Sequence, residues 1–255
     1  MIFKRAVAKL RAQDWTAVTI ELAIVVLGVF LGMWVANRNQ DRQAADQVRQ
    51  TLIQLTPELQ QLEEFSASAR RYYARTGKYA GVAFAGWSGD PAVDDDAFII
   101  AAYQASQIYG FNNNGASWAL VFGAGELRNI ADPAIRQSLT RLMTFDYSTI
   151  NIGAVQTRYR DKVREIIPDS MQQQIRDACG DKLDPGQRTV SLSATCPLKF
   201  DPKLAAEVAA ALHRHRELAG LLRQHRSVVS AYLTNLDLFD AQEKILAQRI
   251  ALLER

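Results

Sequence analysis

The sequence predicts an all-α protein: an N-terminal transmembrane helix continues into an elongated helical-bundle ectodomain, which a long C-terminal helix closes. Three observations carry this prediction. Glycine and proline number only 14 and 7 in 255 residues, fewer than a turn-rich sandwich or barrel needs. One apolar stretch near the N-terminus is long enough to cross a bilayer. At both ends of the remaining chain, apolar residues recur at intervals of three and four, the spacing of long amphipathic helices.

The charge of the chain is concentrated at its N-terminus. The formal net charge is +3, and the first fourteen residues account for it, because Asp14 is outnumbered by Lys4, Arg5, Lys9 and Arg11. The body that follows is neutral, whereas nucleic-acid-binding proteins carry a broad basic surface, so nucleic acid is not expected as a partner. We predict that residues 1–15 form a basic tail on the cytoplasmic side.

The transmembrane helix is predicted over residues 16–36. Eighteen residues separate Trp15 from Trp34, and Glu21 is the only charged residue among them. At a rise of ~1.5 Å per residue the two tryptophans lie roughly 28 Å apart, close to the hydrocarbon thickness of a bilayer. Indole rings favour the headgroup level, which fits a tryptophan at each end. A buried core helix or a cleaved signal peptide is disfavoured by the length of the run and by the bulky Trp34 near its end.

The charges that flank the span predict its orientation. Four basic residues precede the span, and Arg38, Arg42 and Arg49 follow it, which is a small positive-inside bias. A short basic tail before a first span usually stays in the cytoplasm, and long C-terminal domains are translocated largely regardless of their charge. We therefore expect a single-pass protein of the bacterial inner membrane, with residues 37–255 forming a periplasmic helical domain.

The two cysteines favour the same orientation. Cys179 and Cys196 bracket a loop that contains Gly180, Pro185 and Gly186, residues that permit tight turns. A disulfide across such a loop stabilises by about 3 kcal/mol in the chain-entropy model and persists in an oxidising compartment. The alternative is a pair of unrelated free thiols in a cytosolic domain.

The span also carries a possible contact face. Gly28 and Gly32 form a G-x-x-x-G motif, which lets two helix backbones approach closely. Glu21 lies on the same face, because it is seven residues from Gly28. We predict contacts through this face with a second copy of the chain or with another membrane protein, besides the lipid bilayer itself. Glu21 is either a packing or topology residue or a carboxylate with a proton-linked or partner-binding role.

The span and its exit contain three short runs: Thr19-Ile20-Glu21-Leu22, Ile24-Val25-Val26-x-Gly28, and Asn37-Arg38-Asn39-Gln40-x-Arg42. Together they resemble the N-terminal signature of a family of uncharacterised bacterial single-span membrane proteins. That family commonly has an Asn-Trp-Asn type of exit, and this chain departs from it at Arg38. The resemblance covers residues 15–42 and implies a membrane-anchored protein without implying any biochemical activity.

Two long amphipathic helices are predicted at the ends of residues 37–255. The first has a seam that continues past Pro57, which should kink the helix, and consists of Ala45, Val48, Leu52, Leu55, Leu59, Leu62 and Phe65. The second seam is interrupted by His225 and Glu243 and otherwise consists of Leu218, Leu222, Val229, Tyr232, Leu236, Phe239, Leu246, Ile250 and Leu253. We expect the two helices to pack antiparallel. A parallel pairing of two chains through the first seam is the alternative, and periodicity does not separate the two.

Further helices are predicted between these two. A capping acid precedes a proline at Asp132-Pro133 and at Asp201-Pro202, and Asp90-Pro91 lies shortly before the acids Asp94–Asp96. One helix is expected over Asp96–Tyr109 with its end at Gly110, and another from Pro133 toward Ile167 with its end at Pro168. Residues 112–115 have the composition of a turn. No pair of strands is predicted.

The sequence offers little catalytic chemistry. Half of the aromatic residues lie in residues 72–122, among them Trp118 and Phe122, and form either an aromatic pocket or, as we favour, ordinary core. His213 and His215 point to different faces of a helix, so they do not share a metal, and Asp94–Asp96 fit helix capping better than calcium. No catalytic, cofactor-binding or metal-binding residue is predicted, and no enzyme activity is expected.

The function expected from these features is that of a membrane-anchored helical protein. It would act through protein–protein contacts, as a scaffold or an accessory subunit. The alternative is a periplasmic ligand-sensing domain that signals through a partner in the membrane, with the aromatic region as its pocket.

Overall fold

The computed structural model describes residues 15–109, 126–152, 157–184, 186 and 189–253. It confirms the all-α prediction. The α-helices of the described residues are α2 (Trp15–Gln54), α3 (Thr56–Trp87), α4 (Asp95–Gln104), α6 (Pro133–Met143), α7 (Arg158–Ile166), α8 (Asp169–Cys179), α9 (Pro202–Arg214) and α10 (Glu217–Leu253). Two 3₁₀ turns, η1 (Glu126–Asn129) and η2 (Tyr147–Ile150), and two short strands, β1 (Lys182–Asp184) and β2 (Thr189–Ser191), complete these elements.

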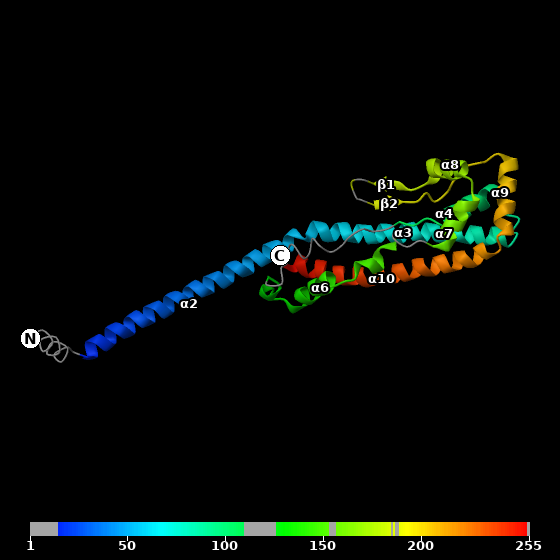
Figure 1. Cartoon of the computed structure of the whole chain (residues 1–255). Coiled ribbons are helices and arrows are strands. Elements are labelled where there is room, and N and C mark those ends of the chain that lie inside the picture. Colours follow the sequence, from blue (N-terminus) through cyan, green and yellow to red (C-terminus); the bar gives the residue numbers. More distant parts are fainter. Residues whose placement is uncertain (1–14, 110–125, 153–156, 185, 187–188, 254–255) are drawn as a thin grey trace, which may run out of the picture.

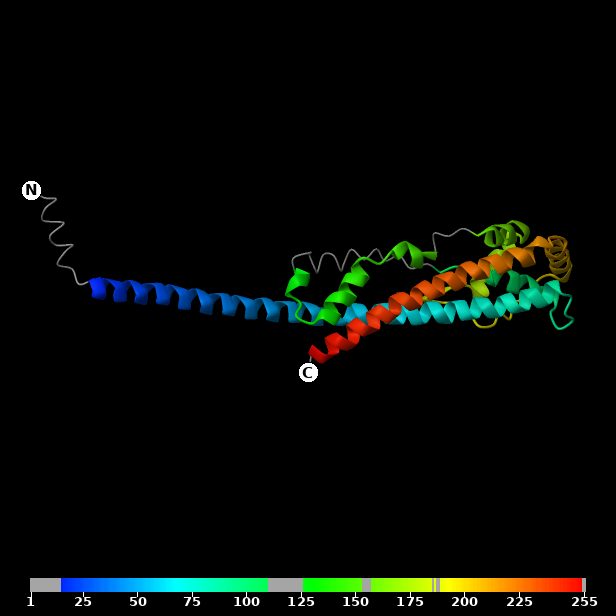
Figure 2. The same cartoon turned by 90° about the horizontal axis from the view of Figure 1, so that it is seen from below.

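The molecule is elongated because α2 projects from the helical body as a single helix (Figures 1 and 2). The chain passes from α2 to α3 almost without a break: Leu55 donates its N–H to the carbonyl of Leu52 at 3.1 Å and accepts from the N–H of Leu59 at 3.0 Å. Pro57 lies in the first turn of α3, where its missing N–H leaves no helical bond unmade. The predicted kink is therefore a change of helix at Leu55.

The two predicted seams meet antiparallel inside the body. The N-terminal seam is buried from Leu52 to Phe65, whereas Val48 is half-buried and Ala45 is exposed. α10 lies along α3, and the guanidinium of Arg49 donates to the carbonyl of Leu253 at 2.9 Å. Within this chain α10 covers the first seam, so that seam does not need a second copy of the chain to bury it.

The body has two adjoining cores. The core nearer to α2 combines the first half of α3 with α6 and the second half of α10, and the farther core combines α4, α7, α8, α9 and the first turns of α10. Gly86 brings α3 close to α4, because a Cβ at this position would collide with the ring of Phe98. α3 ends just before Gly89, whose φ of 79° suits glycine and turns the chain toward α4.

The predicted helix starts are confirmed. Asp132 accepts a hydrogen bond from the N–H of Ala134 at 2.7 Å, and Asp201 accepts one from the N–H of Leu204 at 3.0 Å. The helix start near Asp90-Pro91 is that of α4. Its cap is Asp94, which accepts a hydrogen bond from the N–H of Ala97 at 2.8 Å. These carboxylates satisfy N–H groups that have no partner within the helix.

The prediction of a helix over Asp96–Tyr109 was wrong at its end, because α4 stops at Gln104. The hydroxyl of Tyr73 on α3 donates to the carbonyl of Tyr109 at 2.8 Å and accepts from its N–H at 3.0 Å. The hydroxyl of Ser106 donates to the carbonyl of Tyr103 at 2.6 Å, in place of a continuing helical bond. Gly110 and residues 112–115 lie outside the described residues.

A single helix from Pro133 toward Ile167 was also predicted, and this was wrong. α6 ends at Met143, and Asp146 starts η2 by accepting from the N–H of Ser148 at 3.0 Å. Thr157 then caps α7, where its hydroxyl accepts from the N–H of Arg160 at 3.4 Å. Each capping side chain offers the backbone a partner that competes with a continuous helix.

A small hairpin lies between α8 and α9, where no strands were predicted. β1 and β2 pair antiparallel with Leu183 opposite Val190. The hairpin packs on α3: the hydroxyl of Ser68 donates to the carbonyl of Val190 at 3.2 Å, and that of Tyr79 to the carbonyl of Ser193 at 3.0 Å. Strands of three residues are too short for an alternating pattern to show in the sequence.

Candidate functional site

The apolar part of α2 is the largest feature that the fold leaves uncovered. Its large apolar side chains between Ile20 and Val35 are 43–66% exposed, which makes a continuous apolar surface far larger than soluble monomers usually expose. The most apolar window of the helical run Thr19–Trp87 has a mean hydropathy of 2.2 and no buried residue. This helix is therefore long and apolar enough to span a membrane.

A cation–π contact lies at the C-terminal end of the apolar segment. The guanidinium of Arg38 lies over the ring of Trp34, 5.3 Å from its centroid. A tryptophan near the end of the apolar segment, stacked under an arginine that follows it by one helical turn, suits the headgroup region, where an apolar ring and a charged group are both accommodated. This end of the apolar segment has the chemistry of a membrane interface.

The predicted contact face of the span lies on bare helix. Glu21, Gly28 and Gly32 are all exposed, and a Cβ added at either glycine would meet no heavy atom within 4 Å. Helical spacing keeps the three residues on one side of α2. No other residue that the structure describes covers this face.

The structure joins Cys179 and Cys196 in a disulfide with a Cα–Cα distance of 5.4 Å, within the usual range. Cys179 is buried at the end of α8, and Cys196 follows the hairpin. The bond therefore ties both ends of the hairpin segment to α8. The hairpin in turn covers one side of α3 through the hydrogen bonds from Ser68 and Tyr79.

The aromatic region of residues 72–122 contributes mostly to the core. Tyr72, Tyr73 and Tyr103 are buried, and Trp87 packs edge-on against Phe98 with the ring centroids 5.3 Å apart. Their geometry supports the core interpretation for the described residues, because these rings fill space against one another. Trp118 and Phe122 lie outside the described residues.

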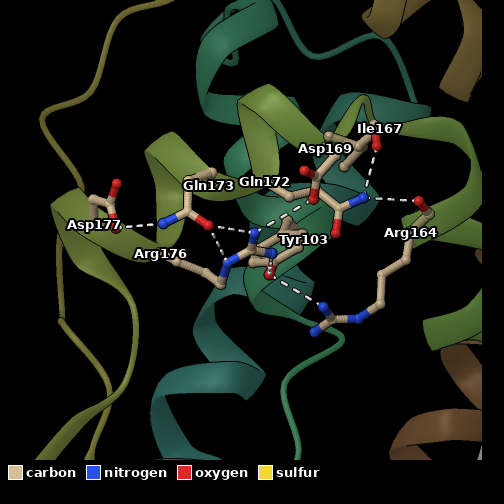
Figure 3. A network of polar contacts seen from close by, with 8 residues as sticks. All are labelled: Tyr103, Arg164, Ile167, Asp169, Gln172, Gln173, Arg176 and Asp177. Atoms are coloured by element: carbon tan, nitrogen blue, oxygen red, sulfur yellow. Dashed lines mark hydrogen bonds and ion pairs between the residues drawn. The ribbon is translucent and has the colours of Figure 1, made fainter.

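A polar network ties α4, α7 and α8 together (Figure 3). The hydroxyl oxygen of Tyr103 accepts from Arg164 at 3.1 Å and from Arg176 at 3.4 Å. The guanidinium of Arg164 also lies over the Tyr103 ring, 4.7 Å from the centroid. Gln172 donates to the carbonyls of Arg164 and Ile167 at 2.8 and 2.7 Å. The network joins three helices around one buried tyrosine, and sequence reasoning missed it because its members lie far apart in the chain.

A second arginine of α7 reaches the centre of the body. Arg160 donates to the carbonyl of Ser106 at 3.0 Å, and its burial together with the nearby Arg164 lowers its pKa. Across from it, the hydroxyl of Tyr72 donates to Asp181 at 2.8 Å. Burial raises the pKa of Asp181, although this hydrogen bond and the two arginines act in the opposite direction. These contacts fix α3, α7 and the start of the hairpin relative to one another.

The histidines and acids whose side chains could ligate a metal contact other residues. His213 packs on Phe98 with the ring centroids 4.7 Å apart, and His215 contacts Glu217 at 2.9 Å. Lys199 bridges Asp94 and Asp96 at 2.8 and 3.1 Å. Within the described ranges no three His, Cys, Asp or Glu residues are grouped so that they could hold a metal ion.

The two interruptions of the C-terminal seam are both buried. His225 is 2% exposed, and its Nδ1 lies 2.8 Å from the hydroxyl of Thr157. Burial, and then the charge of Arg160, lower the pKa of His225 to about 4. Glu243 is 1% exposed, and its burial together with the nearby Asp240 raises its pKa to about 8. Between about pH 4 and pH 8, both side chains are therefore mainly neutral.

Two of the cavities that the described residues form adjoin α3. One, of about 200 Å³, lies between α3 and the hairpin and is lined by Arg71, Arg75, Lys182 and Asp184 among others. The other, of about 210 Å³, lies between α3 and α10, where His225 forms part of its wall. Both contain polar groups in addition to apolar walls.

Comparison with known proteins gives no relative of this chain. No family model, no curated protein and no solved structure matches it. The resemblance of residues 15–42 to a family of single-span proteins stays a prediction.

Proposed function

We propose that this chain is a single-span protein of the bacterial inner membrane, whose periplasmic helical domain acts through protein–protein contacts as a scaffold or accessory subunit. The observation that carries the proposal is the apolar segment of α2, of which no residue in its most apolar window is buried. Water would hydrate that surface at a large free-energy cost, whereas a bilayer accepts it.

The shape of the molecule supports a role in contacts. Beyond the span, α2 continues as a mostly polar helix over residues 37–47, all exposed apart from the half-buried Ala44. From residue 37 to residue 47 this stalk is roughly 15 Å long at ~1.5 Å per residue, and the body begins where Val48 and Leu52 pack against its core. It holds the body away from the membrane surface, where the body is accessible to other proteins.

The periplasmic orientation draws on two features. A disulfide between Cys179 and Cys196 persists in an oxidising compartment and is rare in the cytosol. The basic tail before the span favours a cytoplasmic N-terminus. A reporter that is active only in the cytoplasm, fused after Arg255, should give no signal; strong activity would reverse the orientation.

The second part of the proposal concerns the span itself. Gly28 and Gly32 leave bare backbone on one face, which allows a second copy or another membrane protein to pack closely. Glu21→Gln tests the role of the carboxylate on that face, because it keeps hydrogen bonding and removes the charge. If association survives while the activity of the complex fails, the proton-linked role is supported; if both survive, Glu21 is a packing residue.

Membrane anchoring is tested with a matched pair of variants. Introducing arginine at the centre of the span, as Val25→Arg with Val29→Arg, should move the protein out of the membrane fraction, because each charge costs about 2.5–3.5 kcal/mol there. Ala45→Arg is the control, since it adds a charge to an exposed position of the same helix outside the span. Release of the unmodified protein by alkaline carbonate would contradict the proposal.

Ligand sensing is the second candidate function. It is favoured by the cavity between α3 and α10, because α3 continues directly into α2 and links this cavity to the span. Binding of a small molecule to the unmodified protein would favour sensing over a purely structural role.

A further inference from the structure

The face of α10 that points away from the core carries a line of large apolar side chains. Outside α2, the large apolar side chains that are exposed among the described residues are Val82, Leu183 and three on α10, namely Leu238, Ile245 and Leu252. The three on α10 are 61%, 42% and 59% exposed and follow one another at intervals of seven residues. Two helical turns take nearly seven residues, so these side chains form one line along the outside of the body, where α10 runs in Figure 2.

Two further residues extend this line into a heptad pattern. Ala241 and Gln248 come three residues after Leu238 and Ile245, and both are exposed. The alternation of three and four is the a/d pattern of a coiled coil. We call this set the outer seam, and it consists of Leu238, Ala241, Ile245, Gln248 and Leu252. It is distinct from the buried seam of α10, which packs inside the body.

The charged residues that flank the outer seam have partners within their own chain. Each of them forms an ion pair with a residue of opposite sign: Asp237 with Arg70 at 2.7 Å, Lys244 with Asp240 at 3.0 Å, and Arg249 with Asp132 at 3.6 Å. In coiled coils the residues beside the seam select a partner by its charge. Because these charges are neutralised within the chain, the outer seam favours a partner helix with a neutral, apolar face over a strongly charged helix.

The outer seam is itself such a face, and it is complementary to its own copy. When two copies lie in parallel and in register, each large apolar residue meets its equivalent, and the small Ala241 lets the helices approach closely. Gln248 then faces the same residue of the other copy. A carboxamide both donates and accepts hydrogen bonds, so two of them pair with each other. A polar side chain within a seam also specifies the register of the pair.

We propose that the outer seam of α10 binds the outer seam of a second copy of the chain, in parallel and in register. The parallel direction rests on the proposed function, because two copies anchored in one membrane hold their α10 helices in the same direction. From Leu238 to Leu252 the seam is roughly 21 Å long at ~1.5 Å per residue, so the contact is small. Anchoring compensates for this, since confinement to one membrane raises the effective concentration of each copy around the other.

The contact is tested by disulfide crosslinking of the full chain in membranes. Leu238→Cys should give a dimer on a non-reducing gel after mild oxidation, because the two copies meet at this position. The native cysteines are bonded to each other, so the added thiol is the reactive one. Arg226→Cys is the control, since Arg226 is an exposed residue on another side of α10, and it should give far less dimer. Equal dimer from the two variants would overturn the proposal.

The direction of the pair is tested by co-expressing two cysteine variants. In an antiparallel pair Leu238 lies opposite Gln248 of the other copy. Leu238→Cys co-expressed with Gln248→Cys should therefore give mainly the two self-crosslinked dimers. A predominant mixed dimer would overturn the parallel arrangement.

The register is tested with charge variants at Ile245, in the Leu238→Cys background. Ile245→Lys and Ile245→Glu should each lower crosslinking by roughly tenfold or more, because like charges then face each other. Co-expression of the two variants should restore crosslinking, since opposite charges then meet; a failure to restore it would contradict the in-register contact. Retention after alkaline carbonate, measured on the same membranes, reports on anchoring separately. A retained protein that gives no crosslink above the control therefore overturns the outer seam without contradicting the membrane span.

Discussion

Glu243 shows how a single residue sets a pH dependence. Its carboxyl group is buried on the seam of α10, one of its oxygens lacks a partner, and its burial, with the negative charges of Asp240 and Glu63, raises its pKa from 4.5 to about 8. Lys244 and Arg70 oppose this shift without cancelling it. The unfolded chain releases this proton at lower pH than the folded chain does. Stability should therefore fall as the pH rises from about 4.5 to 8.

Glu243→Gln is expected to remove this dependence. The variant should be more stable than the unmodified protein at pH 8 by an amount on the order of a few kcal/mol, and the gain should shrink toward pH 5. Chemical unfolding of the full chain in detergent at both pH values measures it. Glu207→Gln, at an exposed position of α9, is the control and should change little. An equal gain at pH 5 and pH 8 would contradict the explanation.

His225 has the opposite effect on the pH dependence of stability, because it lowers the stability of the fold as the pH falls. Its pKa of about 4 in the folded chain lies below the ordinary value of 6.5, because burial disfavours the charged ring. The unfolded chain takes up this proton first as the pH falls from 6.5 to 4, so this residue destabilises the fold in that window. His225→Gln should flatten the loss of stability between pH 6.5 and pH 5, as followed by thermal unfolding. An unchanged pH profile would show that His225 does not titrate as described.

His225 and Glu243 also show how much the sequence predicts about a single residue. Spacing placed His225 and Glu243 on the buried seam, and the structure agrees. Spacing gave no indication that Thr157, from α7, is the partner of His225, because a pairing over such a distance along the chain depends on the fold.

At the scale of elements, helix starts were predictable where an acid precedes a proline, whereas other starts and the helix ends were not. The caps at Asp132 and Asp201 follow from an acid before a proline, a purely local rule. The end of α4 depends on Tyr73, a residue of another helix that binds the backbone of Tyr109. The break after α6 depends on caps at Asp146 and Thr157, which are local but carry no proline to mark them.

The disulfide ties the hairpin segment to α8, while hydrogen bonds from Ser68 and Tyr79 connect that segment to α3. Replacing both cysteines, as Cys179→Ala with Cys196→Ala, should cost about 3 kcal/mol of stability and loosen the hairpin more than α3 itself. Denaturant unfolding gives the first quantity, and amide hydrogen exchange in residues 182–193 gives the second. Reductant should change the unmodified chain but not the double variant. Equal exchange rates in the hairpin of both proteins would show that its contacts with α3 suffice.

At the scale of the whole molecule, α2 projects from the body, and no residue in its most apolar window is buried by the described part of the chain (Figure 1). The replacement of Gly28 and Gly32 by isoleucine should weaken association of the chain in membranes and leave insertion intact, because isoleucine suits lipid but holds a partner helix away. Energy transfer between labelled copies in vesicles measures association. Ala23→Ile, on another side of the helix, is the control. Equal transfer in the double variant and the unmodified chain would refute the glycine contact.

The angle between α2 and α3 at Leu55 also sets where the body lies relative to the proposed span (Figure 1). From residue 37 to Trp87 the two helices measure roughly 75 Å along their axes at ~1.5 Å per residue. Because the two axes are inclined to each other, the far end of the body lies at less than this distance from residue 37. With the proposed span in a bilayer, a membrane-bound partner that touched the far end of the body would itself have to extend well beyond the bilayer surface.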